Sequence, residues 1–298
     1  MKSLTIGNSI FEWGRQTYVM GIINATPDSF SGDGLLRGED WLAAAVAQGR
    51  QFAADGAHLL DVGGESTRPG AQPVTAAEEI RRVAPVIREL AQAVNLPISV
   101  DTYRAEVAAA ALDAGAHLVN DVWGLRMDPD LAALCAARNV PVVVMHNRSK
   151  PKDITQDARL GSSYIGPHYD DLLADVTREL QQSIDLARQA GIPTEHIIID
   201  PGLGFGKTVA QNLSLINRLD HFKALGCPIL LGPSNKSFIG YTLDLPPDDR
   251  LEGTAATVAI GITHGADIVR VHQVKALARV AKMTDAIVRG AMAANPSP

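Results

Sequence analysis

Cysteine is scarce in this sequence, which has only Cys135 and Cys227 among its 298 residues. Neither lies near a second cysteine or a histidine at the spacing of metal ligands, so the cysteines give no sign of a metal cluster. We expect two reduced, buried thiols, as is usual in a cytoplasmic protein.

Long apolar runs and an excess of positive charge are also missing. No stretch approaches the roughly 18 apolar residues that a membrane span needs. Residues 1–11 lack the basic start and apolar core of a signal peptide, so we expect a cytoplasmic location. The net charge of −6 at pH 7 argues against nucleic acid or an anionic membrane as the main partner.

The composition that remains is that of a folded protein, with 46% hydrophobic and 20% charged residues. Short Val/Ile/Leu runs alternate with Ala-rich stretches whose apolar residues recur every three or four positions, which predicts strands and helices in turn. The expected strands cover 18–24, 58–62, 98–102, 117–121, 141–145, 196–200, 227–232 and 267–271. The expected helices cover 41–54, 76–94, 104–114, 130–138, 169–190, 209–219, 253–264 and 275–293.

Eight strand–helix units with no change of composition predict an α/β fold, a single (β/α)8 TIM barrel domain over residues 1–298. A doubly wound open sheet is the alternative. Two short strands at 4–6 and 10–13, split by Gly7-Asn8, predict an N-terminal β-hairpin within residues 1–16.

Polar residues follow five of the expected strands. Each alone is best explained as a helix N-cap, but their repetition at the carboxyl ends of strands favours a lined pocket. Acids and amides there can hydrogen-bond the edge of a flat heterocycle that is rich in N–H donors. The residues are Asn24, Asp61, Asp101, Asn120 with Asp121, and Asp200. Of these, Asp101, Asn120 and Asp200 are the candidates for reading the ring, whereas Asp61 and Asp121 are expected to support or cap.

Cations lie near the seventh and eighth strands. Many barrels bind phosphate after these strands, and Arg and Lys hold phosphate by charge-assisted bonds. Lys236, Arg270, His272 and, from a loop, Arg68 therefore predict a basic corner beside the acidic end. A lone histidine such as His272 is more often a satisfied structural residue, and that alternative stays open.

Two long βα loops, residues 25–40 and 63–75, are rich in Gly, Pro, Ser and Thr. We expect them to close over a ligand, the alternative being surface insertions. Residues 202–208 read Gly-Leu-Gly-Phe-Gly-Lys-Thr, but a Walker A motif needs glycine where Pro201 stands, so we expect a flexible turn before a helix at Val209. Residues 147–167 show little pattern, which is typical of a rim loop.

Taken together, these motifs resemble the dihydropteroate synthase family, in order and over nearly the whole chain. The two most specific are Gly-Ile-Ile-Asn-Ala-Thr-Pro-Asp-Ser-Phe-Ser at 21–31 and Asp-Val-Gly-Gly-Glu-Ser-Thr-Arg-Pro-Gly at 61–70. The others lie at 99–104, 120–124, 145–146, 200–207, 234–240 and 270–272.

The resemblance implies a (β/α)8 barrel that joins 6-hydroxymethyl-7,8-dihydropterin pyrophosphate to p-aminobenzoate, giving 7,8-dihydropteroate and pyrophosphate. It implies that Asp101, Asn120, Asp200 and Lys236 bind the pterin, with Asp101 and Lys236 catalytic, and that Asn24 ligates a Mg²⁺ held by the pyrophosphate. Thr67, Arg68, Arg270 and His272 would contact the pyrophosphate, and Ser237, Phe205 and the long loops would shape the p-aminobenzoate site. It also implies a homodimer packed through the last helices.

At a few positions the sequence differs from the residues that are usual in the family's motifs. Asn235 stands where arginine is usual and Gln273 where aspartate is usual, while Asn147 and Ser149 differ on the rim. Two alternatives follow. One is a pterin-binding methyltransferase, which the phosphate-binding cations disfavour; the other is a non-catalytic pterin-binding paralogue, which only Asn235 and Gln273 encourage.

Overall fold

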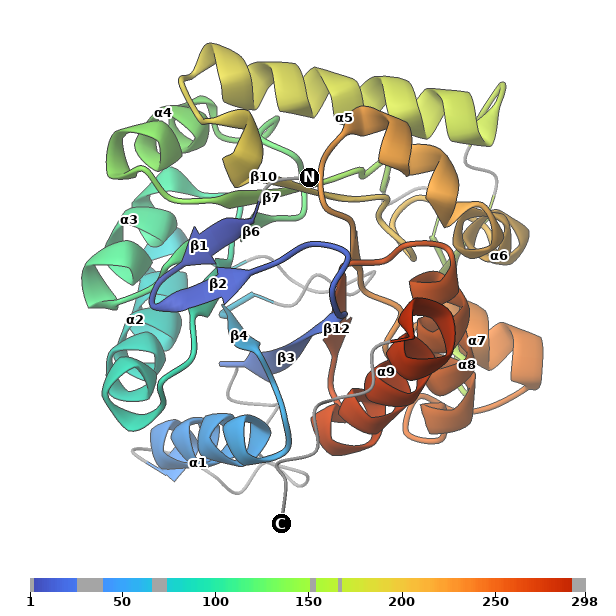
Figure 1. Ribbon diagram of the computed structural model, residues 1–298, viewed down its shortest axis with the longest axis horizontal. Coiled ribbons are helices and arrows are strands. Elements are labelled where there is room, and N and C mark those ends of the chain that lie inside the picture. Colours follow the sequence, from blue (N-terminus) through green and yellow to red (C-terminus); the bar gives the residue numbers. More distant parts are fainter. Residues whose placement is uncertain (1–2, 26–39, 66–73, 151–153, 166–167, 291–298) are drawn as a thin grey trace.

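The barrel is closed and built from parallel strands wrapped by helices (Figure 1). The computed structural model describes residues 3–25, 40–65, 74–150, 154–165 and 168–290. Its eight-stranded sheet has the order β10-β7-β6-β5-β4-β3-β12-β11, and a parallel bridge between Ile199 and Ile229 joins its two ends. Because the order around the barrel follows the chain, the expected (β/α)8 barrel is confirmed and the open doubly wound sheet is excluded.

The barrel strands are almost entirely buried, as a parallel sheet covered by helices requires. Their registers bring the ends of neighbouring strands to one level, since Asn24 pairs with Gly63, Gly63 with Asp101, and Asp101 with Asn120. The strands are β3 (Tyr18–Asn24), β4 (Leu59–Gly63), β5 (Ile98–Asp101), β6 (Leu118–Asp121), β7 (Val142–Met145), β10 (Ile197–Asp200), β11 (Leu230–Leu231) and β12 (Ile268–Val271).

The eight expected helices are all present, with ends that differ by a few residues. Capping residues set several of these ends: Thr75 Oγ1, for example, accepts the Glu78 amide at the start of its helix. The helices are α1 (Asp40–Ala54), α2 (Ala76–Ala93), α3 (Ala105–Ala114), α4 (Pro129–Arg138), α5 (Leu172–Gln189), α6 (Val209–Asn217), α8 (Leu251–Thr263) and α9 (Val274–Arg289).

The short elements between these units were not predicted. The seventh strand, expected over 227–232, pairs regularly only at Leu230–Leu231. Helix α7 (Ser237–Leu243) and the 3-10 helix η3 (Leu219–Leu225) are too short to show a period. A hairpin of β8 (Ile154–Asp157) and β9 (Gly161–Tyr164) lies where a patternless rim loop was expected, and a 3-10 turn, η2 (Thr194–His196), precedes β10.

The expected N-terminal hairpin closes the amino end of the barrel (Figure 1). It consists of β1 (Leu4–Ile6) and β2 (Ser9–Phe11), and we call this closed end the floor. Leu4, Ile6 and Phe11 pack against a buried layer of barrel side chains that includes Met20 and Leu59. The opposite end, where the strands carry their polar residues, is therefore the one available for ligands.

Two other expectations from the sequence can be checked in the described residues. Cys135 and Cys227 are both buried and unpaired, which confirms the expected thiols. Among the described residues, no helix is both long enough and apolar enough to cross a membrane.

Candidate active site

An ion-paired cluster occupies the carboxyl ends of β4, β5, β6 and β12. Arg270 donates from Nε to Asp61 Oδ2 and from Nη2 to Asp101 Oδ2, each at 2.6 Å. Asn120 Nδ2 donates to the same Asp61 oxygen at 3.0 Å. The other carboxylate oxygen of Asp61 is buried and has no hydrogen-bond partner among the described residues. One guanidinium thus serves two acids, and the cluster retains acceptor capacity.

Asp101 is the member of this cluster whose protonation is most altered. Burial raises the pKa of Asp101 to about 7, against the attraction of Arg270 and with added repulsion from Asp61. Its side chain is still 10% exposed, so it faces the mouth of the barrel rather than its core. A carboxyl group of this kind changes charge near neutral pH.

A second cluster lies beside the first, around Lys236. Its ammonium donates to the carbonyl of Leu203 and lies 4.6 Å from the centre of the Phe205 ring. Burial lowers the pKa of Lys236 to about 8, with Asp200 opposing the shift. A side chain on Gly232 would come within 4.0 Å of both Asp200 Oδ2 and Lys236 Nζ, so this glycine leaves open the space that the two charges share.

Asp200 is oriented by the loop that follows β10. Its Oδ1 accepts the backbone N–H of Gly202 at 2.7 Å, while burial raises the pKa of its carboxyl group. Helix α6 begins at Val209 as expected, behind a capping box of Thr208 and Gln211. The expected turn over 202–208 is thus confirmed, although its backbone is held by many hydrogen bonds rather than left loose.

His272 is held by the neighbouring loop. Its backbone N–H donates to Ser234 Oγ at 3.1 Å, and its Nδ1 lies 2.9 Å from the same oxygen. Asn235 and Gln273, the two residues that differ from those usual in the family, also meet here: Gln273 Nε2 lies 3.4 Å from Asn235 Oδ1. Asn235 has a left-handed backbone, at φ +55°.

The structure brings most of the predicted site residues to one end of the barrel. Asp101, Asn120 and Arg270 share the first cluster, and Asp200, Phe205 and Lys236 share the second. Asn24 ends β3, and Ser237 opens α7 directly after Lys236. Thr67 and Arg68 lie outside the described residues, as do most of the two long loops.

Three expectations are refined by these contacts. The basic corner is not separate from the acids, because Arg270 is paired with two carboxylates. Asp61 bonds directly to Asn120 and to Arg270, a pairing that no sequence pattern could reveal. Asp121 has the supporting role expected of it: it accepts the backbone N–H groups of Trp123 and Leu125 in the turn after β6, whereas Asp128 caps α4.

A further set of buried and half-buried polar side chains lies behind this site: Lys207, His146, Glu179 and Arg148. Lys207 and His146 belong to segments that resemble the family's motifs, at 200–207 and 145–146, but no sequence pattern indicates that these four side chains meet.

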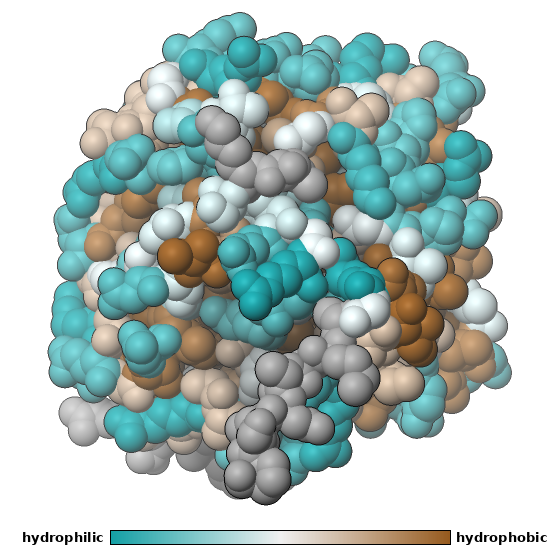
Figure 2. Space-filling view, viewed as in Figure 1, coloured by the Kyte–Doolittle hydropathy of each residue, from teal (hydrophilic) through white to brown (hydrophobic). Residues whose placement is uncertain are grey.

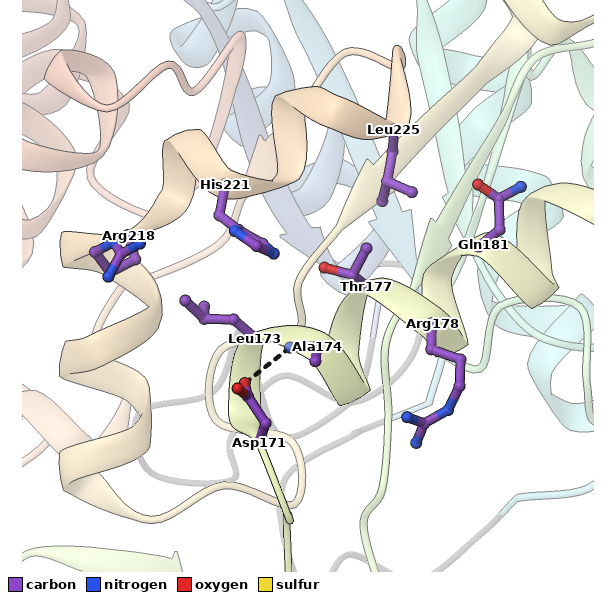
Figure 3. A pocket seen from close by; sticks show the side chains of 9 residues that line it. All are labelled: Asp171, Leu173, Ala174, Thr177, Arg178, Gln181, Arg218, His221 and Leu225. Carbon is purple, nitrogen blue, oxygen red and sulfur yellow. Dashed lines mark hydrogen bonds between the residues drawn. The ribbon is translucent and has the colours of Figure 1, made fainter.

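A cavity of about 670 Å³ lies away from these clusters, on the outer side of the barrel between α5 and η3 (Figure 3). Its lining includes Leu173, Arg178, Arg218 and His221, and Asp171 at its edge caps α5 through the Ala174 amide. It contains none of the predicted site residues. Another hollow, of about 300 Å³, includes His272 and Gln273 and lies between α1 and α9.

Comparison with known proteins identifies the class that this fold and site define. A model of the family "Pterin binding enzyme" matches residues 20–272. The dihydropteroate synthase of Bacillus subtilis (strain 168) is 48% identical over 280 residues, which are 94% of this chain and 92% of that protein.

Solved structures agree. The dihydropteroate synthase from Clostridium difficile, in the presence of pteroic acid, has a TM-score of 0.84 and 45% identity, over 94% of this chain and 99% of that one. The Xanthomonas albilineans dihydropteroate synthase with 4-aminobenzoic acid has a TM-score of 0.85 and 42% identity, over 96% and 97%.

The chain is thus a pterin-binding enzyme built on a (β/α)8 barrel. Within that class it belongs to the dihydropteroate synthase family, the transferases of folate biosynthesis that condense the pterin pyrophosphate with p-aminobenzoate.

Proposed function

We propose that this chain performs the dihydropteroate synthase condensation with the two clusters at the mouth of the barrel. The observation that carries the proposal is the juxtaposition of the acid–amide cluster around Asp101 with the Asp200–Lys236 pair. Together they offer acceptors and a donor to the edge of one flat heterocycle.

In this proposal the pterin is bound by Asp101, Asn120, Asp200 and Lys236. The carboxylates accept its N–H groups, in the paired geometry that suits a guanidine-like edge. The unpaired oxygen of Asp61 supports the assignment, because a buried acceptor without a partner is costly until something donates to it.

Mg²⁺ fits the site as a group carried in by the pyrophosphate. Within the described residues there is no group of three His, Cys, Asp or Glu side chains that could hold a metal by itself. Mg²⁺ commonly uses one or two protein oxygens together with substrate phosphates and water. Asn24, half-buried at the end of β3, would supply such an oxygen. When bound, the ion would offset the negative charge of the pyrophosphate.

The leaving group and the amine have separate partners in the proposal. Thr67, Arg68, Arg270 and His272 bind the pyrophosphate, and Phe205, Ser237 and the long loops shape the p-aminobenzoate site. Arg270 is paired with Asp61 and Asp101, yet its side chain is 20% exposed, so it can also contact the pyrophosphate.

The chemistry proposed is a dissociative substitution. The C–O bond to pyrophosphate breaks first, and the electron-rich pterin delocalises the positive charge that develops on the carbon. The arylamine nitrogen then forms the C–N bond and loses a proton to solvent. Asp101 stabilises the cationic ring electrostatically, and closed loops keep out water, which would compete as nucleophile.

Pyrophosphate release, measured with saturating Mg²⁺ and the pterin pyrophosphate, with and without p-aminobenzoate, tests the activity. We expect sustained release only with p-aminobenzoate. No release with both substrates would leave a pterin-binding methyltransferase or a non-catalytic paralogue. Scrambling of an isotope label within the bound pyrophosphate would support the dissociative order; its absence with strict inversion would favour concerted attack.

The proposal extends to a cytoplasmic homodimer packed through the last helices. Large apolar side chains are exposed there: Ile260 on α8, and Met283, Ile287 and Val288 on α9. Figure 2 shows hydrophobic surface in the region of these helices. Ile287 is 70% exposed, the most of these four side chains, so it is the best position at which to test the interface.

Ile287→Arg should convert a dimer into a monomer in sedimentation equilibrium, because a charge in an apolar interface is poorly compensated. Ile10→Arg, an exposed isoleucine on the floor hairpin, is the matched control and should leave the mass unchanged. A wild-type chain that sediments as a monomer would refute the dimer.

A further inference from the structure

The loop after β10 supplies contacts to both charged groups of the second cluster. The N–H of Gly202 is bonded to Asp200, and the carbonyl of Leu203 accepts the Lys236 ammonium. The ring of Phe205 lies under the same ammonium. Any displacement of this loop would therefore move a carboxylate and a cation together.

The loop cannot hold this shape by backbone preference alone. Gly202, Gly204 and Gly206 all have left-handed backbones, at φ +74°, +75° and +62°. The Phe205 N–H bonds the Gly202 carbonyl at 3.2 Å, but no regular helix or strand ladder runs through the segment, so side chains satisfy much of its backbone. Asn212 Oδ1 accepts the Gly204 N–H at 2.7 Å, and Tyr169 donates to the Gly206 carbonyl at 2.9 Å.

Lys207 contributes the central contacts. Its side chain is only 2% exposed, and its ammonium lies 2.9 Å from the Gly202 carbonyl and 3.0 Å from the Phe205 carbonyl. The third neighbour of Nζ is His146 Nδ1, at 2.9 Å. Three acceptors match the three N–H groups of an ammonium. Two of these partners lie in the loop and the third follows β7, so all three contacts of the ammonium are with buried protein groups.

The groups that surround Lys207 keep His146 in the accepting form. Burial, together with the neighbouring Lys207, lowers the pKa of His146 to about 3, so the ring is neutral. Its Nε2 lies 3.0 Å from Glu179 Oε2, without the alignment of a hydrogen bond. Glu179 on α5 is in turn paired with Arg148. Asp200 and Lys236 are the other charges that act on Lys207.

We propose that Lys207 is a positioning residue of the reaction: by holding the Gly202 and Phe205 carbonyls from within, it fixes the loop that sets Asp200 and Lys236 against the pterin. It touches no substrate atom itself. The inference rests on the proposed function, in which Asp200 and Lys236 bind the pterin.

The test compares pterin binding with stability. Lys207→Met keeps the length and apolar stem of the side chain but removes all three donors. We expect the variant to fold and its dissociation constant for the pterin pyrophosphate, measured by calorimetry without p-aminobenzoate, to rise at least about tenfold. Lys207→Gln retains two N–H donors for the two carbonyls, so it should recover part of the affinity.

A matched variant separates positioning from mere stability. Asp285→Ala removes a buried side chain that bonds Thr17 near the amino end of the barrel, so it should lower the unfolding temperature and leave pterin affinity unchanged. Pterin affinity within twofold of wild type in Lys207→Met, with only the stability loss seen in Asp285→Ala, would overturn the inference. If Lys207→Met does not fold, Lys207→Leu, which also lacks all three donors, takes its place, and pterin affinity within twofold of wild type there would overturn the inference equally.

Failure of the proposed function gives a different pattern. Lys236→Ala removes a group assigned to the pterin itself, and unchanged pterin binding in that variant would refute the assignment whatever Lys207 does. Weak binding in both Lys236→Ala and Lys207→Met, with recovery in Lys207→Gln, supports both proposals.

Discussion

Asp101 shows how much of a residue's role can be predicted from sequence and how much depends on its neighbours. Its place at the end of a strand follows from the apolar run before it. Its ion-pair partner cannot be predicted in this way, because Arg270 is 169 residues away and only the closed barrel brings the two side chains together. The placement of these residues at the carboxyl ends of the strands was therefore predictable, whereas the pairing of Arg270 with Asp61 and Asp101 was not.

The pH dependence of stability should report on Asp101. Its pKa in the folded protein is about 7, compared with about 3.9 for an aspartate in an unfolded chain. Between these values the folded state binds a proton that the unfolded state has lost, so raising the pH destabilises the fold. Against Asp101→Asn, wild type should lose relative stability from pH 5 to 7, by at most about 1.4 kcal/mol per pH unit.

Chemical denaturation of both proteins at several pH values measures that difference. Other buried acids, such as Asp121 and Asp200, are common to both proteins and cancel. Parallel curves would mean that Asp101 titrates normally. In the activity assay, Asp101→Asn should lose about a hundredfold or more in turnover, because the developing cation loses its counter-charge; near-normal turnover would remove it from the chemistry.

Among the elements, the long ones were predicted and the short ones were not. Helices such as α2 and α5 span several turns, so their periodicity survives irregular positions. Helix α7 and the β8–β9 hairpin offer seven residues and two runs of four, too few to distinguish a pattern from chance. The loop after β10 was recognised as a turn, but its anchoring by Lys207 depends on contacts with β7.

Two glycines with nearly the same backbone provide a matched test of that loop. Gly202 has φ +74° and Gly226 has φ +73°. A side chain on Gly202 would lie 1.9 Å from the His146 carbonyl oxygen, whereas one on Gly226 would meet nothing within 4 Å. Gly226→Ala should therefore cost about 1 kcal/mol of stability, from the left-handed backbone alone.

Gly202→Ala should lose the same stability from backbone strain, and roughly 1–3 kcal/mol more from the steric overlap with the His146 carbonyl. Because its amide orients Asp200, it should weaken pterin binding as well, while Gly226→Ala should not. Urea denaturation and calorimetry on both variants measure the two effects. Equal losses in the pair would show that the contact with His146 is relieved at no cost.

At the scale of the whole molecule, the barrel separates its two ends. The floor contains the hairpin and an apolar layer, and the mouth contains the charged clusters. The closed α/β barrel was predicted because eight alternating units leave few other arrangements. That the hairpin would seal the floor was not predicted, because its few apolar residues do not indicate which surface they cover.

Phe11 tests this separation. It is 1% exposed and its ring lies 4.5 Å from that of Tyr18. Phe11→Ala should reduce the free energy of unfolding by about 3–5 kcal/mol and leave turnover of the folded fraction unchanged. Ile10→Ala, at the 65% exposed neighbour, should change stability by less than about 0.5 kcal/mol. A large fall in turnover of folded Phe11→Ala would show that the ends are coupled.

The closed floor also determines where the fold tolerates substitutions. The side chains beneath the hairpin form a buried apolar layer, so we expect substitutions there to act through stability, and this layer supports the fold independently of the polar residues at the mouth. Asn235 and Gln273 differ from the family's usual residues and contact each other at the rim. Neither belongs to the apolar layer under the hairpin, so substitutions at this pair leave that layer intact.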